Sequence, residues 1–363
     1  MDLPPSPRDR ALDVAKGLAI TGIVMSDVLR GLVAAAVIDP LQPWYEEVDT
    51  AFYLVHLGVF FLLSGAFVAR GVRRAGASAY LRRRLAVLSW LFVVWTLIQG
   101  TIQVLTSRWV NTPISWTEVP LGLLQPLGQL WFLPTLAVFS VAVVVLAPWQ
   151  SRVRAIITIA LTLVVSLTWW GYSYAWFGTH GPAMALFFTT GVLIADERLR
   201  RWLRSPRALL VGVVGAVVYA LLIALTDPIA PPEHFALLPV DAASVSAGVV
   251  ASVAGVIAVV VASRWIADLL VIGPAFARVG VRSLEIFLAH IIVAAGLRIV
   301  LVRLGIDSAL VLAAVLTVAA VSVPMALAAL APRLGLAWLF SAPTAWQRLW
   351  AGSADPAAQA GSS

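Results

Sequence analysis

The sequence predicts an all-α, polytopic integral membrane protein, and composition, hydropathy and tryptophan content lead to this fold class. Of its 363 residues, 61% are hydrophobic and only 12% are charged, whereas soluble domains are about 25% charged. Mean hydropathy is +0.94, and apolar runs long enough to cross about 30 Å of hydrocarbon recur along the chain. The 15 tryptophans fit aromatic anchoring at membrane interfaces.

These apolar runs predict about ten transmembrane helices. We expect them at roughly 14–36, 52–69, 85–105, 128–147, 154–172, 181–195, 208–226, 243–263, 283–302 and 308–330. Residues 1–332 then form a single transmembrane domain, and residues 333–363 form a C-terminal tail. The end of that tail, AGSADPAAQAGSS, has the composition of a disordered segment.

Basic residues are concentrated in alternate connections between the apolar runs. Arginines cluster near 70–84, 198–207 and 278–282, whereas acidic residues dominate the connections near 37–51 and 227–242. Since basic loops stay in the cytoplasm, these arginine clusters and both chain termini are predicted to be cytoplasmic. Bases in short clusters between apolar runs, rather than along one soluble face, argue against a nucleic-acid partner.

Several kinds of chemistry are excluded or not expected. The chain has no cysteine, which rules out disulfides, thiolate nucleophiles and thiolate metal sites. It also has no His-x-x-x-His pattern and no glycine-rich phosphate loop, so we expect neither a metal site nor a bound cofactor. Ionisable side chains at membrane depth are therefore the main functional candidates.

The first span carries three such side chains. Lys16 and Asp27 are eleven residues apart, which is three helical turns plus about 20°, so they share one face about 16 Å apart along the axis. Arg30 follows Asp27 at the i+3 position and could pair with it. These charges form either a structural ion pair or a polar track from a cytoplasmic cation to a reactive group.

The second span enters from the other side of the membrane and carries His56 about one turn in. Its depth should therefore be close to that of Asp27, and we expect an Asp27–His56 contact. Such a carboxylate would raise the basicity of the imidazole and fix its tautomer, as the orienting carboxylate of a hydrolytic triad does.

Two later segments contribute further candidates. GQLWFLPTL, residues 128–136, contains Trp131, which either anchors the helix at the interface or lines a cavity. SLEIFLAHIIVAAGLRIV, residues 283–300, places Glu285 near the cytoplasmic boundary, His290 about 10 Å deeper, and Arg298 near the outer end. His290 either lines the active cavity or is a hydrogen-bonded structural residue.

Together, these segments resemble the integral-membrane acyltransferase-3 family. DVAKGLAITGIVMSDVLRGL is similar to that family's first helix, in which a basic residue is followed, after ten others, by a histidine. VHLGVFFLLSG, GQLWFLPTL and SLEIFLAH resemble its second-helix motif, its tryptophan motif and its late serine-to-histidine motif. The resemblance extends from about Asp13 to about Leu330.

The resemblance implies a function and a set of site residues. Family members typically move an acyl group from a cytoplasmic donor, usually acetyl-CoA, to a hydroxyl of an extracytoplasmic glycan or glycolipid. For this chain it implies a multi-pass protein of a bacterial cell membrane, in contact with the lipid bilayer and its two substrates. Lys16, Asp27 and His56 are the catalytic candidates, and Arg30, Trp131, Glu285 and His290 are the candidates for substrate binding.

Asp27 departs from the family pattern, because it stands where the family has its histidine. Three alternatives follow: Asp27 acts as the base with a raised pKa, His56 moves the proton while Asp27 orients it, or the chain has lost acyl transfer and kept the fold. A transporter or permease, with the buried charges as coupling groups, and a non-catalytic partner in envelope assembly are the competing functions.

Overall fold

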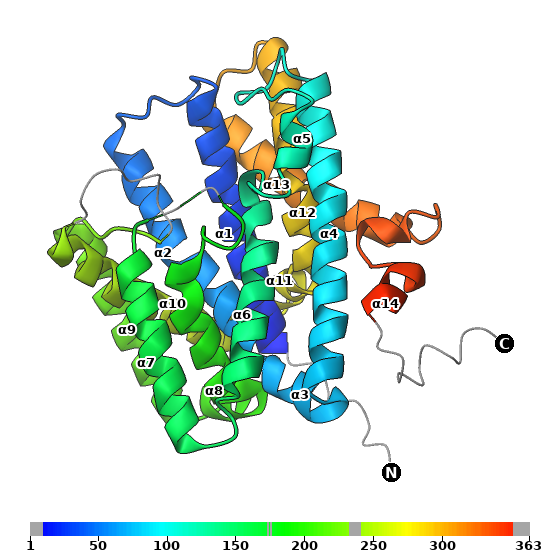
Figure 1. The fold of residues 1–363 in the computed structure, drawn as a ribbon. Helices are drawn as coiled ribbons and strands as arrows, with labels where there is room; N and C mark the ends of the chain where they lie inside the picture. The colour runs from blue at the N-terminus through cyan, green and yellow to red at the C-terminus, as the bar shows by residue number, and fades with distance from the viewer. Residues whose placement is uncertain (1–9, 173, 175, 232–240, 351–363) are drawn as a thin grey trace.

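The computed structural model describes residues 10–172, 174, 176–231 and 241–350, and that part of the chain is α-helical with no strand (Figure 1). Its helices, in chain order, are α1 (Arg10–Ala34), α2 (Pro43–Ala66), α3 (Val68–Ala75), α4 (Ala77–Leu105), α5 (Glu118–Leu121), η1 (Gly128–Trp131), α6 (Phe132–Leu146), α7 (Arg152–Trp169), η2 (Pro182–Met184), α8 (Ala185–Leu203), α9 (Pro206–Leu225), α10 (Ala242–Ile266), α11 (Ile272–Val281), α12 (Ser283–Arg303), α13 (Ala309–Leu330), η3 (Ala337–Leu339) and α14 (Thr344–Trp350). The predicted all-α membrane fold is confirmed.

Within the described residues, nine helical segments are long and apolar enough to cross a membrane, against the ten that we expected. The missing one is the sixth predicted span, which corresponds to α8. Only its first half is apolar, and the helix is interrupted at Ala195, where φ is +56°. The second half carries arginines, so α8 as a whole does not qualify although it packs along α2.

The first helix lies at the centre of the bundle, where α2, α10, α11, α12 and α13 pack against it. Glycines allow the closest of these contacts. A Cβ atom on Gly17 would lie 2.1 Å from the carbonyl oxygen of Phe276, and one on Gly280 would clash with the carbonyl oxygen of Asp13. Helix α1 can therefore approach α11 backbone to backbone, as small residues permit in membrane helices.

Helices α1, α4 and α12 run in the same direction, which matters for the site. Each begins at the arginine-rich end of the bundle, where α3 connects α2 to α4, and each ends at the opposite end (Figure 1). Low-numbered positions on these helices thus lie near the arginines, and high-numbered positions lie far from them. Intermediate positions such as Asp27 and His290 lie between the two ends.

A buried ion network fastens α3 to α8 at the arginine-rich end. The carboxylate of Asp196, whose side chain is fully buried, lies 2.5 Å from Arg70 on α3 and 3.0 Å from Arg200 on α8. The break at Ala195 precedes this aspartate directly. A buried carboxylate needs such partners to offset its desolvation.

Part of the predicted C-terminal tail is ordered against the bundle. The indole nitrogen of Trp346 on α14 donates to the carbonyl oxygen of Ala86 at 3.0 Å, and Trp95 of α4 donates to Leu339 at 2.7 Å. Residues 333–350 therefore cover one side of α4. The stretch that we expected to be disordered, 351–363, lies outside the described residues.

Candidate active site

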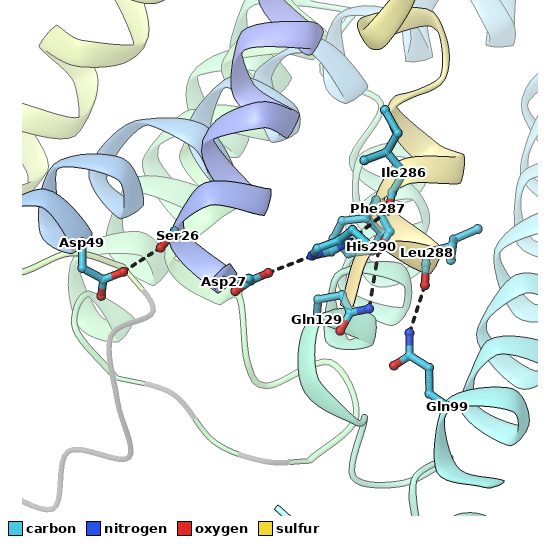
Figure 2. Close-up of polar contacts among 9 residues, drawn as sticks. All are labelled: Ser26, Asp27, Asp49, Gln99, Gln129, Ile286, Phe287, Leu288 and His290. Carbon is cyan, nitrogen blue, oxygen red and sulfur yellow. Dashed lines mark hydrogen bonds and ion pairs between the residues drawn. The ribbon is translucent and has the colours of Figure 1, made fainter. Parts of the chain in front are cut away.

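Asp27 and His290 form a polar pair in the middle of the bundle. The Nε2 atom of His290 on α12 lies 2.9 Å from Oδ2 of Asp27 on α1 (Figure 2). The side chain of His290 is fully buried, whereas that of Asp27 is 22% exposed. Asp27 is therefore the member of the pair that a substrate can touch.

The other ring nitrogen of His290 is held by its own helix. Nδ1 lies 3.0 Å from the carbonyl oxygen of Ile286 and 2.9 Å from that of Phe287. Carbonyl oxygens only accept, so Nδ1 carries a hydrogen and donates it. The contact between Nε2 and Oδ2 then requires one more proton, which the histidine and the carboxylate share.

Two glutamines join neighbouring helices to the same turn of α12. Gln99 of α4 donates from Nε2 to the carbonyl oxygen of Leu288 at 3.0 Å, and Gln129 of η1 donates to that of Phe287 at 3.5 Å. Both reach the backbone just before His290 (Figure 2). They fix α12 against α4 and η1 at the level of the pair.

The expected contact between Asp27 and His56 was wrong. No hydrogen bond joins the two side chains, and Nδ1 of His56 has no hydrogen-bond partner among the described residues. The ring of His56 instead packs edge to face against the ring of Tyr53, with their centroids 4.8 Å apart. His56 lies beside Gly22 of α1, five residues before Asp27 and so about 7.5 Å away along the helix, whereas Asp27 contacts α12.

Arg30 does not pair with Asp27 either. Its Nη2 atom lies 2.6 Å from Oδ2 of Asp49 on α2, and its Nε atom lies 2.9 Å from both carboxylate oxygens. Ser26 donates to the same carboxylate at 2.6 Å (Figure 2), and the ring of Tyr53 lies 3.7 Å from the guanidinium carbon. Because Asp49 satisfies Arg30, Asp27 remains available to His290.

A cavity of about 580 Å³ opens on the arginine-rich side of the pair. We call it the cationic cavity, because Lys16, Arg74, Arg83 and Arg84 line it. Its inner part is apolar and includes Phe132 and Phe287. The rings of these two residues are 5.2 Å apart, and the Phe287 ring is 6.2 Å from that of His290. Phe287 thus lies between the cavity and His290, and Phe132 packs against it.

A second cavity, of about 300 Å³, lies on the other side. We call it the amide cavity, because Gln99, Gln103 and Asn111 line it together with Asp27 and Arg298. On all three parallel helices the order is the same: Lys16 precedes Asp27, Leu88 precedes Gln103, and Ser283 precedes Arg298. The Asp27–His290 pair therefore lies at the boundary between two cavities of different chemistry.

The remaining predicted site residues have different places. Lys16 lines the cationic cavity, with its Nζ atom 4.8 Å from the centroid of the Phe67 ring. Glu285 pairs with Arg282 at 3.0 Å and lines neither cavity. Trp131 is buried, and its ring lies against that of His180, with centroids 4.6 Å apart and the planes tilted by 30°.

Sequence reasoning named Arg298 only by its depth, and it missed His180 and the amide side chains of the second cavity. Arg298 stood out in the sequence as a charged residue inside an apolar run, but the sequence did not show which helix it contacts. His180 gave no signal because it lies in a connection. Burial there lowers the pKa of His180 to about 4, so its ring is neutral where it lies against Trp131.

The family comparison agrees with this architecture. A family model described as an acyltransferase domain matches residues 9–329. The chain therefore belongs to the acyltransferase-3 family and is a multi-pass membrane acyltransferase. No curated protein and no solved structure matches it.

Proposed function

We propose that this acyltransferase moves an acyl group, acetyl in the simplest case, from a cytoplasmic coenzyme A thioester to a hydroxyl of an extracytoplasmic glycan or glycolipid. The observation that carries the proposal is the Asp27–His290 pair at the boundary of two cavities. In this proposal the donor enters the cationic cavity, the acceptor enters the amide cavity, and the cell membrane separates the two compartments.

The charges of the cationic cavity support a polyanionic donor. Arg74, Arg83, Arg84 and Lys16 bring four cations to one cavity, and phosphate groups are held well by such clusters. The inner apolar part, around Phe132 and Phe287, suits the acyl end of a thioester. Those two rings must move for a thioester to reach Asp27.

Proton transfer in this proposal runs through Asp27. Its Oδ2 atom is engaged by His290, and among the described residues its Oδ1 atom has no hydrogen bond. The acceptor hydroxyl gives its proton to Oδ1 as its oxygen bonds to the thioester carbon and the carbon–sulfur bond breaks. The coenzyme A thiolate then takes up that proton and leaves as the thiol.

His290 acts as a positioning residue in this scheme. It is fully buried, so it cannot touch a substrate, but its hydrogen bond to Oδ2 orients the carboxylate so that Oδ1 can take up the acceptor's proton. The arrangement reverses the order of a serine hydrolase, where the histidine faces the substrate and the carboxylate lies behind it. The histidine on α12 thus offers a physical reason why an aspartate can stand at the family's histidine position.

The test compares acyl esters on envelope glycans and glycolipids by mass spectrometry in cells that carry the wild-type gene, a deletion, or a variant. We expect Asp27→Asn to lower the ester content by about 100-fold or more, the range of lost general-base catalysis. His290→Gln should give a similar loss, because it removes the proton-sharing partner.

His56→Gln is the matched control, since it replaces a second buried histidine that does not contact Asp27. It distinguishes the Asp27–His290 pair from an Asp27–His56 pair. We expect His56→Gln to keep near-normal ester content when the protein is present at the wild-type level. Full ester content in Asp27→Asn would contradict the assignment of the site. Ester content that is unchanged by deletion would contradict acyl transfer to the envelope.

A further inference from the structure

Arg298 is a buried cation in the amide cavity for which the described part of the chain provides no acidic partner. It is 5% exposed and lines the cavity together with Asp27. Among the described residues, no carboxylate lies within ion-pair distance of it, and its hydrogen bond goes to the backbone carbonyl oxygen of Gly31. A guanidinium has five N–H donors, so most of its donor capacity is unused by the protein.

Other arginines of the same bundle have a carboxylate or an aromatic ring as a partner. Arg30 is held by both oxygens of Asp49, and Arg70 is held by the buried Asp196. Arg303, one turn and a half after Arg298 on α12, lies over the ring of Trp109 at 5.0 Å. Burying a cation without a counter-charge is costly, so its retention in a cavity is typical of a binding site.

The packing around Arg298 keeps its guanidinium next to α1. Gly31 lies one turn after Asp27, and a Cβ atom at this position would come within 3.3 Å of Nη1 of Arg298. Asn111 donates to the same Gly31 carbonyl at 3.2 Å. The guanidinium therefore lies in the cavity about one helical turn from Asp27, because Gly31 leaves room for it.

The charge balance of the amide cavity follows from these contacts. Asp27 shares a proton with His290, so the pair is neutral as a unit, and Arg298 adds one uncompensated positive charge. Gln99, Gln103 and Asn111 add dipoles but no charge. A neutral acceptor would leave Arg298 without a counter-charge, whereas an acceptor with one anionic group would neutralise it.

We infer that the acceptor is anionic: a hydroxyl-bearing molecule with a carboxylate or phosphate group that pairs with Arg298 while its hydroxyl lies at Asp27. This inference rests on the proposed function for the role of Asp27, but the anion site itself does not depend on it. The amides of the cavity serve the neutral hydroxyl groups of the same molecule, and Arg298 selects its charge.

The first experiment identifies the charge of the product. Acyl esters that disappear on gene deletion are isolated, and the ester-bearing glycan or glycolipid is sequenced by mass spectrometry. We expect a carboxylate or a phosphate on the sugar that bears the ester or on its neighbour. An ester on a neutral oligosaccharide overturns the inference while leaving the proposed function intact.

The second experiment measures binding without turnover and so remains decisive if no ester is found. The purified full-length chain in detergent is titrated with sodium glucuronate, glucose 6-phosphate or glucose, and thermal stabilisation reports binding. We expect at least one of the two anions to bind about tenfold more tightly than glucose. Whichever of glucuronate and glucose 6-phosphate binds more tightly shows whether the site prefers a carboxylate or a phosphate. Equal stabilisation by all three, or none by any, overturns the inference.

Variants separate Arg298 from general charge effects. Arg298→Gln keeps a donor for the Gly31 carbonyl and should abolish the preference for the anion, while Arg298→Lys should retain part of it. Arg303→Gln is the matched control, because it removes a cation from the same helix that does not line the cavity. An anion preference that survives Arg298→Gln overturns the assignment.

Discussion

The two cavities that flank the Asp27–His290 pair differ in how they use charge. The cationic cavity is the larger and gathers four basic side chains from α1, α3 and α4. The amide cavity is about half its size and has one arginine among uncharged amides and threonines. The first is suited to a ligand with several negative charges, and the second to a ligand with many hydroxyls and one negative charge.

This difference shows how one bundle can serve two unlike substrates. Three parallel helices line both cavities, so a change of residue type along each helix is sufficient to change the chemistry from one end to the other. The pair at the boundary is the group that both ligands can approach. Three variants can break or sharpen this comparison, from the largest expected effect to the smallest.

Removing the buried carboxylate of Asp196 should have the largest effect, because α3 carries part of the cationic cavity. Asp196→Asn leaves Arg70 and Arg200 without their shared counter-charge. We expect the free energy of unfolding to fall by about 3 kcal/mol, as for other broken buried pairs, measured by thermal unfolding in detergent.

Glu197→Gln is the control for this change, because the adjacent carboxylate is 60% exposed and 3.8 Å from Arg70. It should lower stability by less than about 1 kcal/mol. Equal losses in the two variants would mean that the buried network does not hold α3 in place.

Arg74→Gln should weaken donor binding with little effect on the acceptor. Arg74 lines the cationic cavity, whereas Arg73, its neighbour on α3, lies 3.6 Å from Glu197 instead. We expect the KM for acetyl-CoA to rise about five- to tenfold in Arg74→Gln, since one charge-assisted contact to phosphate is lost. The increase should shrink at high salt, because screening already weakens that contact in the wild type.

Arg73→Gln is the matched variant and should leave the donor KM within about twofold of wild type, because its charge faces Glu197 and not the cavity. A larger effect from Arg73 than from Arg74 would place the donor elsewhere on α3.

Gln103→Met should have the smallest and most diagnostic effect. The Oε1 atom of Gln103 is buried beside the amide cavity and has no hydrogen-bond partner in the described structure. Removing an unsatisfied carbonyl should raise stability by about 1 kcal/mol. Acceptor affinity should fall about fivefold if a substrate hydroxyl donates to that oxygen, measured as the acceptor KM.

Gln99→Met is the comparison, because the Gln99 amide already donates to Leu288 at 3.0 Å. It should lower stability instead of raising it. Gln99 would then hold α12 in place, whereas Gln103, one turn further along α4, would bind the acceptor. Parallel stability changes would contradict this division.

Much of the fold could be predicted from the sequence. Hydropathy runs predicted the helices because a membrane span needs about 20 apolar residues whatever its neighbours are. The exception was α8. The charged residues of its second half are visible in the sequence, but the interruption at Ala195 and the pairing of Asp196 with Arg70 depend on tertiary contacts. The packing of residues 333–350 against α4 was not predicted in detail, since their anchors are indole hydrogen bonds to that helix.

The candidate site was predicted only in part, and Asp27 shows why. The sequence by itself determined that a carboxylate lies inside the first span, on the same face as Lys16, because helical periodicity fixes both depth and face. It also left both His56 and Arg30 as reasonable partners, since periodicity does not show which neighbouring helix that face contacts. Only the tertiary structure decided the pairings, because Asp49 satisfies Arg30 and close packing of α1 against α12 brings His290 to Asp27 and Arg298 to Gly31.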